Sequence, residues 1–445
     1  MNRTSPRILT VLALVAVSSA VLASQPDHHH HSHHKDDQSI GHIHHNASVY
    51  EMSTIVNSDE STKPSDVSAD PDLYLSFEQI VKENGFQYEE HTVTTKDGYI
   101  LKIFRIPGRT TEATTNGKKV ALLQHGILDS ADCWISHRAN VAPAFQVVRA
   151  GYDVWLGNSR GNKYSHSHRN PSISNKDYWS FSFADMGTGD LPAVITYIKA
   201  VTGQDKLAFI GHSQGTTQMY YALAKNEDFY ANSISVFVAL GPVMKLTNSK
   251  SNLLQLIAHN DALLLATCQT LGIYEFFPAN WLTTGAMRLL CGTLPSLCQL
   301  GDYLIADEDL SLDDKDRLTV YFGHFPSGTS LYCLDHYSQI LKADRFQEFD
   351  YGKSENKKRY NSPTPPEINI QGISKVPIAM FVGTKDELAD SADNLWAKTQ
   401  LKTLAFYQEY ALGHLTFMIG NDMSYFNDVL NILQKYHPSS SSFIQ

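Results

Sequence analysis

The sequence predicts an α/β protein with a mostly parallel central sheet, helices on both faces, and a mainly helical cap or lid inserted late in the chain. Short apolar runs alternate with helical periodicity over 70–243 and again over 374–445, which is typical of strand–helix–strand units. The stretch between them, 244–373, has no such runs and has the pattern of helices and loops. A strand, a G-x-S-x-G turn and a helix follow one another over Lys206–Lys225.

Size and charge narrow the class of protein. The chain has 445 residues, of which 42% are hydrophobic and 11% aromatic, enough to bury a large core in one extended domain with an insertion. Its formal net charge is −10, and no basic block offsets it. This composition argues against nucleic acid as a partner.

The first 23 residues have the features of a signal peptide. Arg3 and Arg7 precede an apolar run over 8–21, and a small-residue cleavage site follows at 21–23. The run is too short to anchor the chain in a bilayer, and no other stretch approaches the twenty apolar residues that a transmembrane helix needs. We therefore expect an exported protein that has passed through an oxidising compartment.

Residues 24–69 are polar and rich in histidine, with nine histidines between His28 and His45. The composition predicts a disordered leader. A metal-binding or pH-responsive tail is the alternative, because imidazoles gain charge as the medium acidifies. Asn46 begins an N-x-S sequon, the expected glycosylation site.

Ordered structure is expected from residue 70 onward. Lys96-Asp97-Gly98 is a hairpin signal between two alternating runs. The expected elements of the first half are helix 77–84, strands 89–93, 99–106 and 118–124, helix 139–150, strand 152–156, helix 190–201, strand 206–210, a helix from 216 and strand 233–240.

The serine of the G-x-S-x-G turn, Ser213, is the predicted nucleophile. This turn type holds its serine in a strained conformation beyond the sheet edge. Gly211 and Gly215 lack the Cβ atoms that would collide with the neighbouring strand and helix. The helix that follows directs its first N–H groups at whatever the serine attacks.

A second G-x-S-x-G occurs at Gly157–Gly161, centred on Ser159. A strand precedes it, but the segment that follows is rich in Ser, Asn, His and Pro, as loops are. Because no helix begins behind Ser159, we expect it to be a structural turn residue.

The nucleophile needs a base, and the base needs an acid to orient it. Late strands are expected at 376–382 and 403–407, and Asp386 and His414 follow them. The chain order Ser, Asp, His favours these two residues as acid and base. Glu387 and Asp390 are the alternative acids. Among the histidines, His212 is not chosen because its side chain should point away from the active face. The other histidines that are not chosen are His324, His336 and His437.

Two backbone N–H groups are candidates for an oxyanion hole. One belongs to Gln214, directly after the nucleophile, and the other to Ile127, directly after the His125-Gly126 pair that ends strand 118–124. An ordinary strand-to-helix turn is the alternative at Ile127.

Five cysteines leave at least one thiol unpaired. Cys291 and Cys298 are close enough in sequence to close a small loop and form the preferred disulfide. The cysteines contain no C-x-x-C pair, which argues against a metal site.

Several blocks in order resemble the acid lipase family, which contains gastric and lysosomal acid lipases. The resemblance spans most of the chain from about residue 70. The matching blocks are LQHGIL at 123–128, GYDVWLGNSRGN at 151–162, DLPA at 190–193, GHSQGTT at 211–217 and KDELAD at 385–390.

The resemblance implies an α/β-hydrolase fold with a lid and a cap disulfide. It implies the triad Ser213, Asp386 and His414, with oxyanion donors at Ile127 and Gln214. It also implies triacylglycerols or sterol esters as substrates, taken from a lipid–water interface and cleaved without a metal or other cofactor. A non-catalytic lipid carrier on the same fold, and a metal-binding secreted protein led by the histidine tract, are the hypotheses from other classes.

Overall fold

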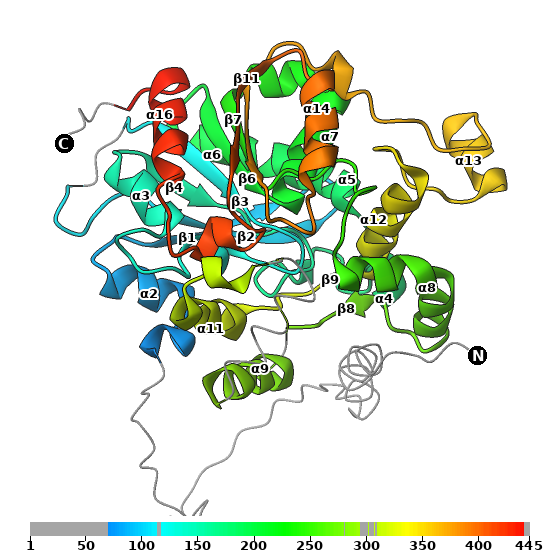
Figure 1. Cartoon of the computed structure of the whole chain (residues 1–445), viewed down its shortest axis with the longest axis horizontal. Coiled ribbons are helices and arrows are strands. Elements are labelled where there is room, and N and C mark those ends of the chain that lie inside the picture. Colours follow the sequence, from blue (N-terminus) through cyan, green and yellow to red (C-terminus); the bar gives the residue numbers. More distant parts are fainter. Residues whose placement is uncertain are drawn as a thin grey trace, which may run out of the picture.

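A nine-stranded sheet organises the molecule (Figure 1). The computed structural model describes residues 70–113, 117–279, 281–293, 301, 307 and 309–439. The predicted signal peptide, the leader and Asn46 lie outside these residues. The strand order is β1-β2-β4-β3-β6-β7-β10-β11, with β5 paired to β2. The strands are β1 (Glu89–Thr94), β2 (Tyr99–Ile106), β3 (Val120–Gln124), β4 (Asp153–Leu156), β5 (Ser167–His168), β6 (Leu207–His212), β7 (Ile234–Leu240), β10 (Ile378–Gly383) and β11 (Leu404–Tyr410).

The six strands from β4 to β11 run parallel, whereas β1, β2 and β5 pair antiparallel at the opposite edge. Parallel strands need crossover connections, and the helical segments between the apolar runs supply them. The carboxyl ends of the strands therefore meet at one edge of the sheet. Gln124 of β3 lies opposite Gly211 of β6, and His212 lies opposite Leu240 of β7.

Alternate residues of each central strand enter different hydrophobic clusters. In β3, Ala121 and Leu123 pack into one cluster, and Val120 and Leu122 pack into the other. Both faces of the sheet are thus covered, which explains why its central strands are continuous apolar runs.

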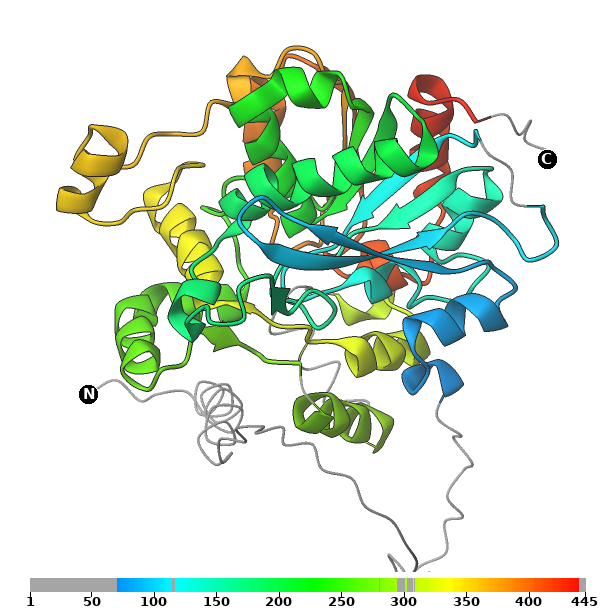
Figure 2. The ribbon, with the colours of Figure 1, turned by 180° about the vertical axis from the view of Figure 1, so that it is seen from behind.

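Helices cover each face of the sheet (Figures 1 and 2). The first cluster includes residues of α2, α3 and α16, and the second includes residues of α6, α7 and α14. The helices outside the predicted cap are α2 (Phe77–Glu83), α3 (Pro143–Arg149), α4 (Asn175–Tyr178), α5 (Phe183–Asp185), α6 (Leu191–Thr202), α7 (Gln214–Ala231), α14 (Ser391–Gln400), α15 (Thr416–Ile419) and α16 (Phe426–Tyr436).

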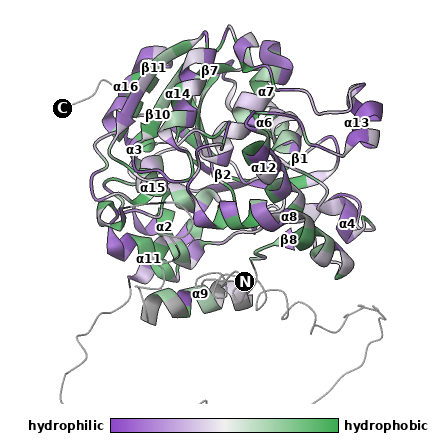
Figure 3. Cartoon of the chain, turned by 45° about the vertical axis from the view of Figure 1, so that its right-hand side comes forward, coloured by the Kyte–Doolittle hydropathy of each residue, from purple (hydrophilic) through white to green (hydrophobic). Residues whose placement is uncertain are grey.

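The chain between β7 and β10 contains the predicted cap, 244–373. Figure 3 shows α13 hydrophilic along its length, whereas α8 carries both hydrophobic and hydrophilic residues. The boundaries of the cap as a unit stay a prediction. Its described elements are α8 (Asn252–Thr270), β8 (Glu275–Phe276), α9 (Trp281–Thr293), α11 (Lys315–His324), β9 (Thr329–Ser330), α12 (Leu331–Ala343) and α13 (Lys353–Tyr360).

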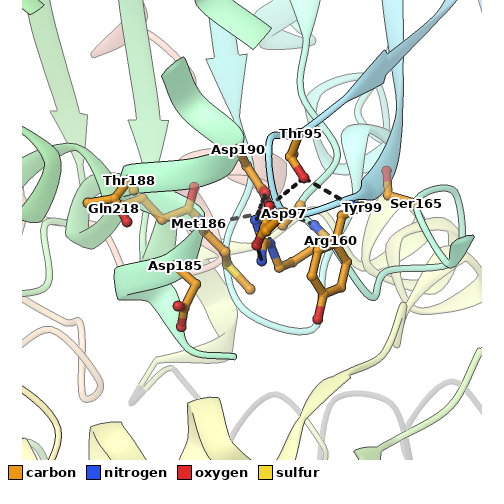
Figure 4. A network of polar contacts seen from close by, with 12 residues as sticks. Thr95, Asp97, Tyr99, Arg160, Ser165, Asp185, Met186, Thr188, Asp190 and Gln218 are labelled. Atoms are coloured by element: carbon orange, nitrogen blue, oxygen red, sulfur yellow. Dashed lines mark hydrogen bonds and ion pairs between the residues drawn. The ribbon is translucent and has the colours of Figure 1, made fainter. Parts of the chain in front are cut away.

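The second G-x-S-x-G segment belongs to a polar network (Figure 4). The Arg160 side chain is 1% exposed and forms ion pairs with Asp190, just before α6, and with Asp97, in the β1–β2 hairpin. The Ser159 hydroxyl accepts hydrogen bonds from the amide groups of Gln124 (2.9 Å) and Gln218 (3.1 Å). These contacts tie the loop to the hairpin, to β3, to the start of α6 and to α7, which is a structural role.

Candidate active site

A sharp turn at Ser213 joins β6 to α7. Ser213 has φ +53° and ψ −119°, a conformation that costs a non-glycine residue free energy and persists only where its surroundings impose it. A Cβ atom on Gly211 would lie 2.8 Å from the backbone carbon of Gly215. A Cβ atom on Gly215 would lie 2.3 Å from the carbonyl oxygen of Gln124. The prediction that these two glycines allow the helix and the strand to approach is confirmed.

The structure brings the three predicted catalytic side chains into one hydrogen-bonded chain. The Ser213 Oγ lies 2.7 Å from Nε2 of His414, and Nδ1 of His414 lies 2.7 Å from Oδ2 of Asp386. The side chains of His414 and Asp386 are 4% and 0% exposed. With Nδ1 donating to the carboxylate, Nε2 is free to accept the serine proton.

Each partner of Ser213 follows a strand at the carboxyl edge of the sheet. Asp386 comes three residues after the end of β10, and its Oδ1 accepts hydrogen bonds from the N–H groups of Leu388 (2.9 Å) and Ala389 (2.6 Å). His414 comes four residues after the end of β11. Both oxygens of the carboxylate are therefore bonded, and its orientation toward His414 is fixed.

One of the two rival acids, Asp390, and the histidines in and after the cap have other partners. Asp390 caps the amino end of α14, where it accepts the N–H of Ala392. The imidazoles of His324 and His336 bond backbone carbonyls of Asp72 and Gln347. His437 follows α16 and packs on Tyr152.

The expected orientation of His212 is wrong. Its ring lies 4.9 Å from the ring of His414, and its Nε2 donates a 3.0 Å hydrogen bond to the carbonyl of His414. The pKa of His212 is well below its usual range, because it is buried and faces a second imidazole. A neutral His212 thus supports the backbone of the histidine loop, a contact between residues 202 positions apart that no local pattern signals.

The loop after β3 approaches the serine closely. A Cβ atom on Gly126 would lie 3.1 Å from the Cβ of Ser213 and 3.5 Å from its Oγ. His125 fixes this loop, since its Nδ1 bonds the carbonyl of Gly126 (2.7 Å) and its Nε2 accepts the N–H of Ser159 (3.0 Å). Burial lowers the pKa of His125 to about 4, which keeps the imidazole neutral and able to make both bonds.

The two predicted oxyanion donors both lie next to residues of this contact. Gln214 is the first residue of α7, so its N–H has no partner four residues earlier in the helix. Ile127 follows Gly126, and both Ile127 and Gln214 line the same pocket as Ser213. Their assignment as donors stays a prediction.

An apolar pocket opens beside the Ser213 hydroxyl. The space between its walls is about 570 Å³, a figure that includes open solvent. Apolar walls of this kind favour a hydrocarbon chain over a polar group. Its walls include Leu246, Leu254, Ile257, Phe276, Leu334 and Leu388.

Three cysteines are free and buried: Cys133, Cys268 and Cys333. Cys291 is disulfide-bonded, but its predicted partner, Cys298, lies outside the described residues, so this pairing stays a prediction. Among the residues that the structure describes, no group of three or more His, Cys, Asp or Glu side chains could hold a metal ion.

Comparison with known proteins agrees with the fold. Residues 120–420 match a family model described as the alpha/beta hydrolase fold, and residues 77–138 match one described as a partial alpha/beta-hydrolase lipase region. A crystal structure from Sulfolobus solfataricus superimposes with a TM-score of 0.51 at 14% identity, over 79% of this chain and 94% of that one. The protein is therefore an α/β-hydrolase, as the sequence predicted.

Curated relatives narrow the class. The chain is 36% identical to human "Lysosomal acid lipase/cholesteryl ester hydrolase", over 83% of this chain and 93% of that protein. It is 36% identical to bovine "Gastric triacylglycerol lipase", over 82% and 93%, and 37% identical to "Lipase lipl-3" of Caenorhabditis elegans, over 73% and 82%. The chain belongs to the acid lipase family and is a serine ester hydrolase. In the described part of the chain, no helix has the length and apolar content of a membrane span.

Proposed function

We propose that this protein hydrolyses the ester bonds of neutral lipids, triacylglycerols or sterol esters, through an acyl-enzyme formed on Ser213. The observation that carries the proposal is the unbroken hydrogen-bonded chain from Ser213 through His414 to Asp386. A serine hydroxyl becomes an effective nucleophile only when a positioned base accepts its proton.

In the proposed mechanism, His414 Nε2 takes the Ser213 proton as Oγ attacks the ester carbonyl. The negative charge on the carbonyl oxygen is stabilised by the N–H groups of Ile127 and Gln214, each worth roughly 3 kcal/mol. The Asp386 carboxylate stabilises the imidazolium, which then protonates the leaving alcohol. Water, activated by the same His414, releases the fatty acid and restores Ser213.

The substrate class rests on the pocket and on the relatives. The pocket beside Ser213 is almost wholly apolar, so it favours a hydrocarbon chain over a polar acyl group. The names of two relatives specify triacylglycerol and cholesteryl ester. We propose that the protein acts at a lipid–water interface after export, in an extracellular or gut lumen, with the lysosome as the alternative destination.

A carrier on the same fold would bind lipid without reacting. The contact between Ser213 and His414 favours an enzyme instead, because a carrier has no need to hold a base 2.7 Å from a hydroxyl.

Labelling with a fluorophosphonate distinguishes the two hypotheses. Wild type should be labelled and should release fatty acid from emulsified triolein or cholesteryl oleate at some pH between 4 and 8. Ser213→Ala should fold but should neither be labelled nor release fatty acid. Ser159→Ala, at the second G-x-S-x-G, should still be labelled and still release fatty acid. A wild-type protein that is neither labelled nor active would refute the proposal, and so would a Ser213→Ala variant that is still labelled.

A further inference from the structure

One acidic residue of the predicted cap, Asp307, contacts the loop that carries His414. The side chain of Asp307 is buried with no exposed surface. Its Oδ1 accepts the backbone N–H of His414, and its Oδ2 accepts the N–H of Leu415 at 3.0 Å. Both carboxyl oxygens therefore hold the main chain at the residue that bears the imidazole and at the one after it.

The main chain of Asp307 contacts the second catalytic loop. It forms an isolated antiparallel bridge with the main chain of Asp386. A single residue between β7 and β10 thus binds the loop after β10 through its backbone and the loop after β11 through its side chain. These two loops must keep a fixed distance for His414 Nδ1 to stay 2.7 Å from Asp386.

The histidine loop is shaped to receive this carboxyl group. A Cβ atom on Gly413 would lie 2.3 to 2.7 Å from the three carboxyl atoms of Asp307, so only glycine leaves room for it. The N–H of Gly413 is bonded by the Thr416 hydroxyl at 3.0 Å. The N–H groups of Gly413, His414 and Leu415 thus all have hydrogen-bond partners. Thr416, in the same loop, accepts the first, and Asp307 accepts the other two.

The chain just after Asp307 reinforces the contact. Asp314 donates its N–H to the carbonyl of Ile419 (2.9 Å), and Asn421 donates its N–H to the carbonyl of Leu312 (2.8 Å). Asp313 forms a bridge with Gly420 between these two bonds. Asp307 and residues 312–314 thus contact the chain at 414–415 and at 419–421.

Two other carboxyl groups, those of Asp313 and Asp386, lie close to Asp307. Burial, followed by the neighbouring carboxylates of Asp313 and Asp386, raises the pKa of Asp307 well above its usual range. The two N–H bonds that Asp307 accepts from His414 and Leu415 act in the opposite direction and favour its charged form.

We propose that Asp307 is a positioning residue for ester hydrolysis. It fixes the main chain of His414 so that the imidazole stays between Ser213 and Asp386. The inference rests on the proposed function, because it assigns a role in the same reaction. Misplacement of a catalytic group by about 1 Å can cost on the order of 100-fold in rate.

The test compares Asp307→Asn and Asp307→Ala with wild type on a soluble short-chain ester. Active sites are first counted by fluorophosphonate labelling to completion, so that misfolded protein does not enter kcat. We expect Asp307→Ala to lower kcat per labelled site by about 10- to 100-fold with little change in KM. Asp307→Asn, which retains one acceptor oxygen, should lose less. Asp309→Asn, two residues away at a carboxylate that bonds Ser311, should match wild type.

A second variant tests the same contact from the other side. Gly413→Ala places a methyl group against the carboxyl group, and we expect a similar fall in kcat. The double variant Asp307→Ala/Gly413→Ala should be no slower than the slower single variant, because both changes disrupt one contact. If both Asp307 variants keep kcat within twofold of wild type, or if the effects in the double variant multiply, the inference is wrong. Failure of the proposed function is seen separately, as a wild type without turnover or labelling.

Discussion

Replacing Asp386 by asparagine removes one charge from the active site and leaves most of the local structure in place. The Oδ1 of Asp386 accepts N–H groups from Leu388 and Ala389, and an asparagine oxygen can accept the same two bonds. Its amide nitrogen then faces His414 Nδ1, where the carboxylate oxygen now lies 2.7 Å away. Because an amide N–H₂ can only donate, the histidine proton is driven to Nε2, and the ring can no longer accept the proton of Ser213.

The expected loss in rate follows from this geometry. When His414 becomes an imidazolium, its charge lies roughly 4 Å from the carboxylate charge, worth about 4 kcal/mol at an effective dielectric constant near 20. That alone corresponds to about 10³-fold in kcat. The wrong tautomer adds to the loss, so we expect a fall of 10³- to 10⁴-fold, in the range known for this substitution in other serine hydrolases.

The assay is kcat on a soluble short-chain ester, with thermal unfolding to confirm that the variant is folded. The matched control is Asp390→Asn, in the same loop. Asp390 caps α14 by accepting the N–H of Ala392, and asparagine is an equally good cap, so this variant should keep wild-type kcat. If Asp386→Asn retained more than a tenth of wild-type kcat, or if Asp390→Asn were equally impaired, the assignment of the acid would be refuted.

Two further predictions concern stability. Gly215→Ala should lower the free energy of unfolding by about 3 kcal/mol, because the new Cβ would lie 2.3 Å from the Gln124 carbonyl oxygen. The control variant Gly285→Ala should not lower it, because a Cβ atom there would have no atom within 4 Å. Equal urea midpoints for the two variants would contradict this prediction. Burial raises the pKa of Asp129 from 3.8 to about 6, so between these values the native state holds a proton that the unfolded chain has released. Wild type should therefore lose up to about 3 kcal/mol of unfolding free energy as the pH rises from 4 to 7, and Asp129→Asn should lose correspondingly less; identical slopes of unfolding free energy against pH would contradict the assignment.

The sequence by itself determined the elements and the catalytic candidates, because both depend on local physics. Apolar runs and helical periodicity mark the buried strands and their crossovers, and the strand limits differ from the expected ones by only a few residues. The turn at Ser213 needs small residues on either side whatever the rest of the fold does. Asp386 and His414 could be chosen because parallel strands bring their carboxyl ends, and the loops that follow, to one edge of the sheet.

The tertiary structure alone decided which residues support the hydrogen-bonded chain of Ser213, His414 and Asp386. His212 bonds the carbonyl of a histidine 202 positions away, and Asp307 bonds the amide of the same residue across 107 positions. The orientation of a side chain beside a turn, and the partner of a carboxyl group in an irregular segment, depend on packing between distant parts of the chain. Neither periodicity nor a local motif records such contacts, so they become visible only when the loops are placed in space.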